Sequence, residues 1–123
     1  MDITKLLIYV YIIFFISAGI NHFINPQFYD SIVPEFIPYP RQVHQFTGAL
    51  EIIIPLLFLT KYRKEAALIM IVFLIILYGA NFYVWYYNLP YGRTYFSNQQ
   101  HFFRFILQII YIYITYVIYV YDK

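Results

Sequence analysis

The chain has 123 residues, of which 63% are hydrophobic and 11% are charged, and its net charge is +2. Because soluble domains carry about 25% charged residues, this composition excludes an ordinary water-soluble domain, and the small, scattered positive charge excludes a nucleic-acid-binding surface. The sequence has no cysteine, which excludes disulfides, thiol redox chemistry and cysteine-ligated metals.

Long apolar windows predict four membrane-spanning helices, at about residues 5–24, 41–60, 66–87 and 102–121. Each window can cross a hydrocarbon core of about 30 Å as a helix. The runs are continuous, whereas the strands of a membrane barrel alternate apolar and polar residues. Large residues and prolines follow the first window where a signal peptide would have small ones. The sequence therefore predicts one all-α domain over residues 1–123, an integral membrane four-helix bundle.

Basic residues concentrate at the two ends of the chain and in the turn between the second and third spans. Lys5, Lys123 and the three basic residues of "KYRKE" (61–65) make up five of the eight. By the positive-inside rule, both termini and this turn are expected on the cytoplasmic side of an inner membrane, and residues 25–40 and 88–100 on the outer side. The short turn also predicts that the second and third spans are antiparallel neighbours.

The connection over residues 25–40 is too apolar for a solvated loop. Asn25 followed by Pro26 predicts the N-cap and first position of a short helix that ends before Pro34. The apolar residues that follow predict a strap across the end of the bundle. Two interpretations remain open, an interfacial anchor at the level of the lipid headgroups or a lid over a pocket.

Polar side chains within the predicted spans gather in the half of the bundle nearest this connection. Intramembrane polar residues usually face a partner or a cavity. The second and fourth spans each carry a polar stripe at i, i+3 and i+7, namely His44, Thr47 and Glu51 on one and His101, Arg104 and Gln108 on the other. The candidate pocket residues are His22, Asn21, His44, Glu51, Asn81, Arg104 and Gln108.

Glu51 is the deepest charge, and an unpaired carboxylate at that depth would cost several kcal/mol. The long side chain of Arg104 can reach the same level, so the sequence predicts a buried ion pair between the two. Pro55 cannot donate to the carbonyl of Glu51, which favours a cavity over tight packing there. The pair is open to two interpretations, a staple that sets helix register or a wall of a ligand or proton site.

A metal site is geometrically conceivable, because His22, His44 and His101 all lie near the same end of the predicted bundle. Three scattered histidines are more typical of hydrogen-bonded interfacial residues than of metal ligands. We therefore expect no metal.

The segments "AGINHFINPQFYDSIVPEFIP" and "TGALEIIIPLLFLTKYRKEAA", followed by Asn81 and "FFRFILQ", resemble the DoxX-like family of small four-helix membrane proteins. Gly48, Glu51, Arg104 and Gln108 match polar or small positions of that family. The wider group includes a small subunit of a thiosulfate:quinone oxidoreductase, a maturation protein for methylamine dehydrogenase, and eukaryotic chaperones of membrane receptors.

The resemblance and the polar residues leave two functions open. In the first, the protein is an accessory subunit of a membrane redox system. A quinone-like ring would enter from the bilayer, Arg104, His22 or Asn81 would donate to its oxygens, and Glu51 would move protons. In the second, it is a non-catalytic assembly or chaperone subunit whose outer segment binds another membrane protein. Even the first requires a partner protein, because the chain has no thiol and no evident redox centre.

Overall fold

The computed structural model describes residues 2–121, and the protein is all-α, as predicted. Its elements in chain order are α1 (Ile3–Ile24), α2 (Pro26–Asp30), α3 (Pro40–Leu56), the 3-10 turn η1 (Leu57–Leu59), α4 (Arg63–Tyr87) and α5 (Asn98–Val120). Within the described part of the chain, the pairing of extended backbone is limited to an isolated bridge between Tyr91 and Thr94. Lys123, used above to predict orientation, lies outside the described residues.

Four helical segments are long and apolar enough to cross a membrane, which confirms the predicted number of spans. They are Ile3–Ile24, Pro40–Leu59, Arg63–Tyr87 and Asn98–Val120. Large apolar side chains such as Ile13, Ile75 and Phe103 lie exposed on these helices. In a soluble protein these side chains would be costly to expose, whereas lipid solvates them.

Local capping explains why α5 begins four residues before the predicted start of the last span. Ser97 and Gln100 form a capping box, in which Ser97 Oγ accepts from the Gln100 amide (3.2 Å) and Gln100 Oε1 accepts from the Ser97 amide (2.8 Å). At the end of α4, Asn88 adopts a left-handed conformation and the Leu89 amide donates to the Val84 carbonyl (3.0 Å). This is the Schellman ending that asparagine tolerates.

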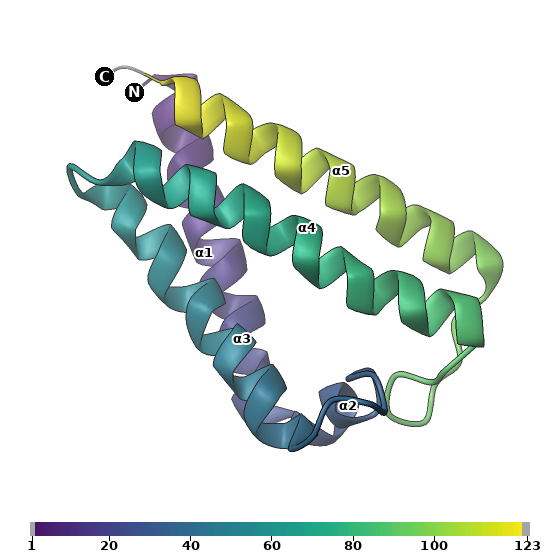
Figure 1. Cartoon of the computed structure of the whole chain (residues 1–123). Coiled ribbons are helices and arrows are strands. Elements are labelled where there is room, and N and C mark those ends of the chain that lie inside the picture. Colours follow the sequence, from purple (N-terminus) through teal and green to yellow (C-terminus); the bar gives the residue numbers. More distant parts are fainter. Residues whose placement is uncertain (1, 122–123) are drawn as a thin grey trace.

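The four long helices form two antiparallel pairs, α1 with α3 and α4 with α5 (Figure 1). The pairs meet at the end that carries both chain termini, which we call the closed end, and diverge toward the other end, which we call the mouth. Apolar side chains from all four helices pack together at the closed end, among them Ile8, Phe15, Ile54, Met70 and Ile118. The bundle is thus packed at one end and open between the pairs at the other.

Basic side chains at the start of α4 bind the last turn of α5 at the closed end. Arg63 Nη2 donates to the Tyr121 carbonyl (2.5 Å) and Lys64 Nζ donates to the Tyr119 carbonyl (3.1 Å). Carbonyls in the last turn of a helix lack helical partners, and cations there also interact favourably with the helix dipole. The basic turn and both termini therefore lie on the same side of the bundle.

The mouth is covered by α2, by the strap (residues 31–39) and by the connection between α4 and α5 (Figure 1). Ser31 joins the strap to that connection, because its Oγ donates to the Pro90 carbonyl (2.9 Å) and accepts from the Gly92 amide (2.9 Å). Helix α2 ends at Asp30, earlier than predicted, and Asn25 does not cap it through its side chain. The Asn25 side-chain Nδ2 donates instead to Asn21 Oδ1 (2.6 Å).

Candidate functional site

A cavity of about 680 Å³ lies between the two helix pairs, near the mouth. Small-molecule sites in proteins typically have volumes of about 300–1,000 Å³. Its lining is mostly aromatic and aliphatic and comes from all four long helices, from α2 and from the strap. Ile32, Val33 and Ile37 of the strap line it, so the strap lies where the lid interpretation would place it.

On the α1–α3 wall, the polar side chains that line the cavity are His22, His44, Thr47 and Glu51. Those of His22 and Glu51 are nine-tenths buried. His22 Nε2 lies 3.6 Å from Glu51 Oε1. The His22 ring also stacks on the Tyr29 ring, with 3.8 Å between centroids. Gly48 leaves room for the imidazole, because a Cβ at that position would lie 2.7 Å from His22 Cβ. The glycine therefore allows the histidine to lie against α3.

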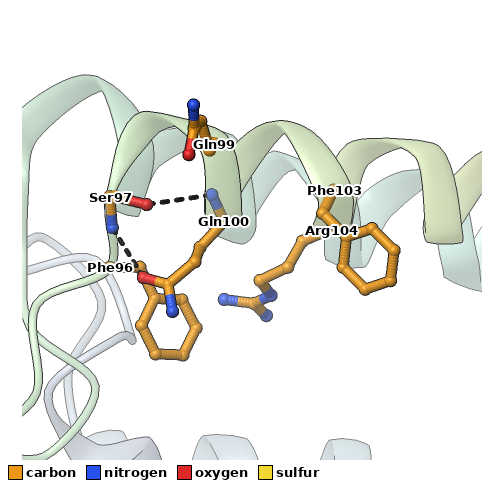
Figure 2. Close-up of a pocket in the computed structure, with 6 residues that line it drawn as sticks. All are labelled: Phe96, Ser97, Gln99, Gln100, Phe103 and Arg104. Carbon is orange, nitrogen blue, oxygen red and sulfur yellow. Dashed lines mark hydrogen bonds between the residues drawn. The ribbon is translucent and has the colours of Figure 1, made fainter.

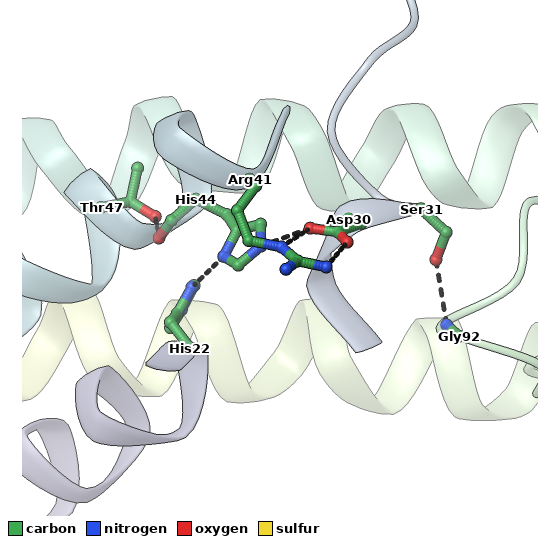
Figure 3. Close-up of polar contacts among 7 residues, drawn as sticks. All are labelled: His22, Asp30, Ser31, Arg41, His44, Thr47 and Gly92. Atoms are coloured by element: carbon green, nitrogen blue, oxygen red, sulfur yellow. Dashed lines mark hydrogen bonds and ion pairs between the residues drawn. The ribbon is translucent and has the colours of Figure 1, made fainter. Parts of the chain in front are cut away.

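A continuous series of polar contacts leads from this wall to the surface (Figure 3). His22 Nδ1 lies 3.4 Å from His44 Nδ1, and His44 Nε2 lies 2.7 Å from Asp30 Oδ1. Arg41 Nη2 donates to the second oxygen of Asp30 at 2.7 Å. Hydrogen bonds from Arg41 hold the pKa of the Asp30 carboxyl below its ordinary value, and the bond to His44 contributes to this shift. Asp30 is therefore a carboxylate at neutral pH.

The opposite wall, from α4 and α5, carries Arg104, Asn81 and Gln108. The Arg104 guanidinium lies 4.2 Å from the centroid of the Tyr91 ring, and its Nη2 donates to Asn81 Oδ1 at 3.0 Å. The Tyr91 hydroxyl also donates to Asn81 Oδ1, at 3.1 Å. Burial raises the pKa of Tyr91, so the phenol keeps the proton that it donates. Gln108 Nε2 donates to the Leu74 carbonyl at 2.8 Å.

The predicted ion pair between Glu51 and Arg104 is not formed within residues 2–121 and has to be corrected. Glu51 faces His22, and Arg104 faces Asn81 and Tyr91. The reason is geometric, because the helix pairs that carry them diverge toward the mouth and the cavity lies between. Glu51 Oε2 and Arg104 Nη1 are both buried without a hydrogen-bond partner.

A second hollow of about 620 Å³ runs along the first turns of α5 (Figure 2). It is lined by Phe96, Ser97, Gln99, Gln100, Phe103 and Arg104. The hydrogen bonds drawn there are those of the Ser97 capping box, which serve the helix start. Arg104 borders both hollows, but its bond to Asn81 ties it to the cavity between the helix pairs.

His101 lies apart from the other two histidines. Its ring stacks on Trp85, with 5.6 Å between ring centroids, and lies 5.8 Å from the Phe96 ring centroid. The ring centroids of His22 and His44 lie 5.5 Å from each other. Among the residues described, no group of three or more histidines and carboxylates is arranged to hold a metal ion. The geometry that made a three-histidine site conceivable is therefore not realised.

Residues 12–119 match the family described as "Domain of unknown function (DUF8561)". The chain belongs to this family. No curated protein and no solved structure shows a significant match. The matched region of the DUF8561 family includes both polar walls, the strap and the Asp30 carboxylate, so the whole candidate site lies inside it.

Six of the seven predicted pocket residues in this DUF8561 chain line the cavity, and Asn21 does not. Asn21 instead donates to the Tyr29 hydroxyl at 2.7 Å and so steadies the ring that covers His22. Sequence reasoning did not identify Tyr29 and Tyr91, which line the cavity, or Asp30, which contacts His44. All three lie outside the predicted spans, where the criterion of polar residues at membrane depth does not apply.

Proposed function

We propose that the protein binds a small, mostly apolar ligand with polar groups at both ends, and that it is an accessory subunit of a quinone-linked membrane redox system. One observation carries the proposal. An apolar cavity between two membrane-spanning helix pairs holds one unpartnered carboxylate oxygen, from Glu51, and one unpartnered guanidinium nitrogen, from Arg104, on its opposite walls.

Buried polar atoms without partners are costly, commonly by about 1–3 kcal/mol for each group and more when the group is charged. A ligand that contacts both walls would remove this cost at both positions. A quinone ring suits such a site, because it is flat and apolar and carries oxygens on opposite sides. Arg104 would donate to one oxygen, and the other would face Glu51 and His22, which can exchange a proton with it.

The resemblance to the DoxX-like family favours the same function, since the wider group includes a quinone-linked oxidoreductase subunit. The chain has no cysteine and no evident redox centre, so the electrons would have to pass to or from another protein. The expected partners are therefore the lipid bilayer and a membrane or membrane-associated redox protein.

The proposed location is an inner membrane, with both termini on the cytoplasmic side and the mouth on the outer side. The support is the basic turn at 61–65, which lies at the closed end together with the termini, and the positive-inside rule. A ligand or partner from the outer side would thus meet the strap first.

The second candidate function is the assembly or chaperone role, and the strap favours it. Phe36 and Tyr39 are large aromatic residues that remain 77% and 73% exposed at the mouth. Exposed aromatics are typical both of membrane interfaces and of surfaces that bind other proteins. On this alternative, the strap would dock another membrane protein and the cavity would hold lipid.

The first test is purification of the full chain in a mild detergent, with mass spectrometry of the proteins and lipids that accompany it. A short-chain quinone analogue is then titrated into the purified protein. We expect Arg104→Gln to weaken binding by about tenfold or more, because a hydrogen bond from a charged donor is lost. Arg93→Gln is the matched control, since Arg93 is exposed in the connection between α4 and α5.

Equal affinity of wild type and Arg104→Gln for the quinone, with melting temperatures also equal, would overturn the proposed ligand. The assembly role is tested with Phe36→Ser and Tyr39→Ser. Two results together would favour the alternative. A membrane protein would co-purify with the wild type but not with these two variants, and the wild type would bind no quinone.

A further inference from the structure

We propose that Asp30, His44, His22 and Glu51 form a proton relay between the water at the mouth and the cavity. The inference rests on the proposed function in one respect, that a ligand in the cavity exchanges protons with the relay. The relay itself consists of four side chains of this protein and can be tested without any ligand.

The four side chains come from three helices and follow one another from the surface inward (Figure 3 draws the first three). The Asp30 side chain is 29% exposed, whereas those of His44, His22 and Glu51 are 4%, 9% and 10% exposed. A buried group that exchanges protons needs a neighbour that leads to water. Here each buried member has such a neighbour in the direction of the mouth.

The direction of each hydrogen bond follows from counting donors. His44 Nε2 donates to the Asp30 carboxylate, so Nδ1 of a neutral His44 is an acceptor. His22 Nδ1, 3.4 Å away, must then be the donor, which makes Nε2 of a neutral His22 an acceptor as well. That nitrogen faces Glu51 Oε1. Two acceptors cannot bond, so this last link requires one further proton.

The further proton belongs either to Glu51 as a carboxylic acid or to His22 as an imidazolium. In the outward step, the Glu51 proton moves to His22 Nε2, the His22 Nδ1 proton moves to His44 Nδ1, and the His44 Nε2 proton moves to Asp30. Three bonds to hydrogen break, three form, and no electron moves. The net result is the transfer of one proton from Glu51 to Asp30, and the reverse step carries a proton inward.

Two of the three links are long for proton transfer: the hydrogen bond between the histidines measures 3.4 Å, and the 3.6 Å between His22 and Glu51 exceeds hydrogen-bond distance. Proton-transfer contacts are often long before a ligand is bound and tighten with it. A small rotation of His22 on its Tyr29 support, or a water molecule, would complete both links.

The groups around the relay favour release of protons at the mouth. Arg41 holds the pKa of the Asp30 carboxyl below its ordinary value, so a proton that reaches Asp30 passes readily to water. The other titratable or charged groups that face the relay or its cavity are Tyr11 from α1, Tyr29 from α2, Tyr83 from α4, Arg104 and Tyr111 from α5 and Tyr91 from the α4–α5 connection. None of these six forms an ion pair with a relay member in the described chain.

The relay ends at the cavity. Toward the closed end the bundle is filled by the apolar core, within which Tyr11 and Thr115 form a buried hydrogen bond (2.6 Å). The relay therefore connects one aqueous side to the cavity without opening a proton path across the whole bilayer.

The test is magic-angle-spinning NMR on the full chain with ¹⁵N-labelled histidine rings, reconstituted in lipid bilayers. The ¹⁵N shifts report which ring nitrogens carry protons, and transfer into D₂O gives the exchange rate of each ring proton. We expect a proton on Nε2 of His44 and on Nδ1 of His22. Asp30→Asn should slow exchange of the His22 ring proton by about tenfold or more.

The matched control for Asp30→Asn is Glu35→Gln, which removes an exposed acid of the strap and should leave the His22 exchange rate unchanged. His101→Gln should likewise leave the signals of the other two histidines in place, because His101 lies against Trp85. If Asp30→Asn does not fold, His44→Gln replaces it, since an amide cannot accept a proton on one side and release one on the other.

The relay would be overturned if the His22 ring proton exchanged in Asp30→Asn or His44→Gln at the same rate as in the wild type. It would also be overturned if His22 and His44 were both neutral and both protonated at Nε2. Failure of this test leaves quinone binding standing, because no ligand is present. Conversely, an intact relay in a protein that binds no quinone would overturn the proposed ligand alone.

Discussion

Glu51 and Arg104 each have a buried polar atom without a hydrogen-bond partner inside the membrane-spanning part of the protein. Glu51 is approached by His22, and Arg104 is bonded to Asn81 and lies over Tyr91. In a low-dielectric interior, removal of one member of a contacting pair leaves the other uncompensated. We therefore expect energetic coupling between residues that contact each other, such as Glu51 and His22. We expect less coupling between Glu51 and Arg104, although their charges are opposite.

A pair of double-mutant cycles tests this expectation. Glu51→Gln combined with His22→Gln should give a coupling energy of about 0.5–3 kcal/mol, the range found for residues in contact. Glu51→Gln combined with Arg104→Gln should give a smaller coupling energy, because the two side chains do not touch. The measurement is unfolding in detergent of the wild type, the single variants and the double variants. A larger coupling for Glu51 with Arg104 would restore the direct ion pair that the structure lacks.

The lowered pKa of the Asp30 carboxyl predicts how the stability of the fold depends on pH. Its folded-state pKa lies below the ordinary value near 3.8, so it contributes stability that is present above that value and is lost as the pH falls through the folded-state pKa. Melting temperatures measured from pH 7 down to pH 3 should fall less steeply in Asp30→Asn than in wild type. Glu35→Gln should retain the wild-type acid response, and an equal slope in Asp30→Asn would contradict the assignment.

At the scale of elements, α1 and α3 approach closely because two glycines face each other where they cross. A Cβ on Gly19 would clash with the Gly48 carbonyl, and a Cβ on Gly48 would lie 2.9 Å from the Gly19 carbonyl. Small residues at such crossings allow membrane helices to pack backbone against backbone. The same close approach brings His22 to the level of Glu51.

Gly48→Ala should therefore destabilise the protein by about 1–3 kcal/mol, the usual cost of overpacking. It should also displace His22, which is visible as a changed ring ¹⁵N shift. Gly79→Ala is the matched control, because nothing lies within 4 Å of a Cβ there and alanine favours the helix. Equal melting temperatures for the two variants would show that the crossing is looser than described.

Ser31 links the two elements that cover the mouth, and its removal should loosen both. Ser31→Ala loses one donor bond to Pro90 and one acceptor bond from Gly92, each contributing about 0.5–1.5 kcal/mol. Hydrogen–deuterium exchange should increase for amides in residues 28–37 and 91–95. Ser17→Ala is the control, because Ser17 bonds only within α1 in the described contacts, and it should leave exchange at the mouth unchanged.

At the scale of the whole molecule, two tightly paired helical hairpins meet at one end and enclose a cavity at the other. The end that is packed also holds the basic turn, and the end that is open holds the strap and the polar walls. This asymmetry means that the side of the membrane from which the cavity exchanges protons is set by the orientation of the chain.

The orientation can be measured by cysteine labelling, since the chain has no native cysteine. With an impermeant thiol reagent on intact cells, Phe36→Cys at the mouth should be labelled and Lys61→Cys at the closed end should be labelled only after permeabilisation. Both side chains are exposed, so accessibility to the reagent is not limiting. The reverse pattern would invert the proposed orientation and leave the fold unchanged.

The sequence by itself determined the number of spans, their approximate limits and the level of the polar side chains. Hydropathy and helical rise are local quantities, so the depth of Glu51 and the shared face of His44 and Glu51 can be read from spacing alone. Helix ends were less well predicted where a side chain decides them, as the Ser97 capping box does at the start of α5. The spacing of Ser97 and Gln100 was a local signal that could have located that start.

Only the tertiary structure decided which polar groups meet. The angle between the two helix pairs depends on packing at the closed end, and the contact of His22 with Glu51 depends on the Gly19–Gly48 crossing within one pair. Spacing along one helix reports neither. That angle separates Glu51 from Arg104 and makes room for the cavity. It is likewise the fold of the strap that brings Asp30, which no periodic pattern marks, within 2.7 Å of His44. Contacts between segments distant in sequence follow from how the helices pack, and that is decided by the chain as a whole.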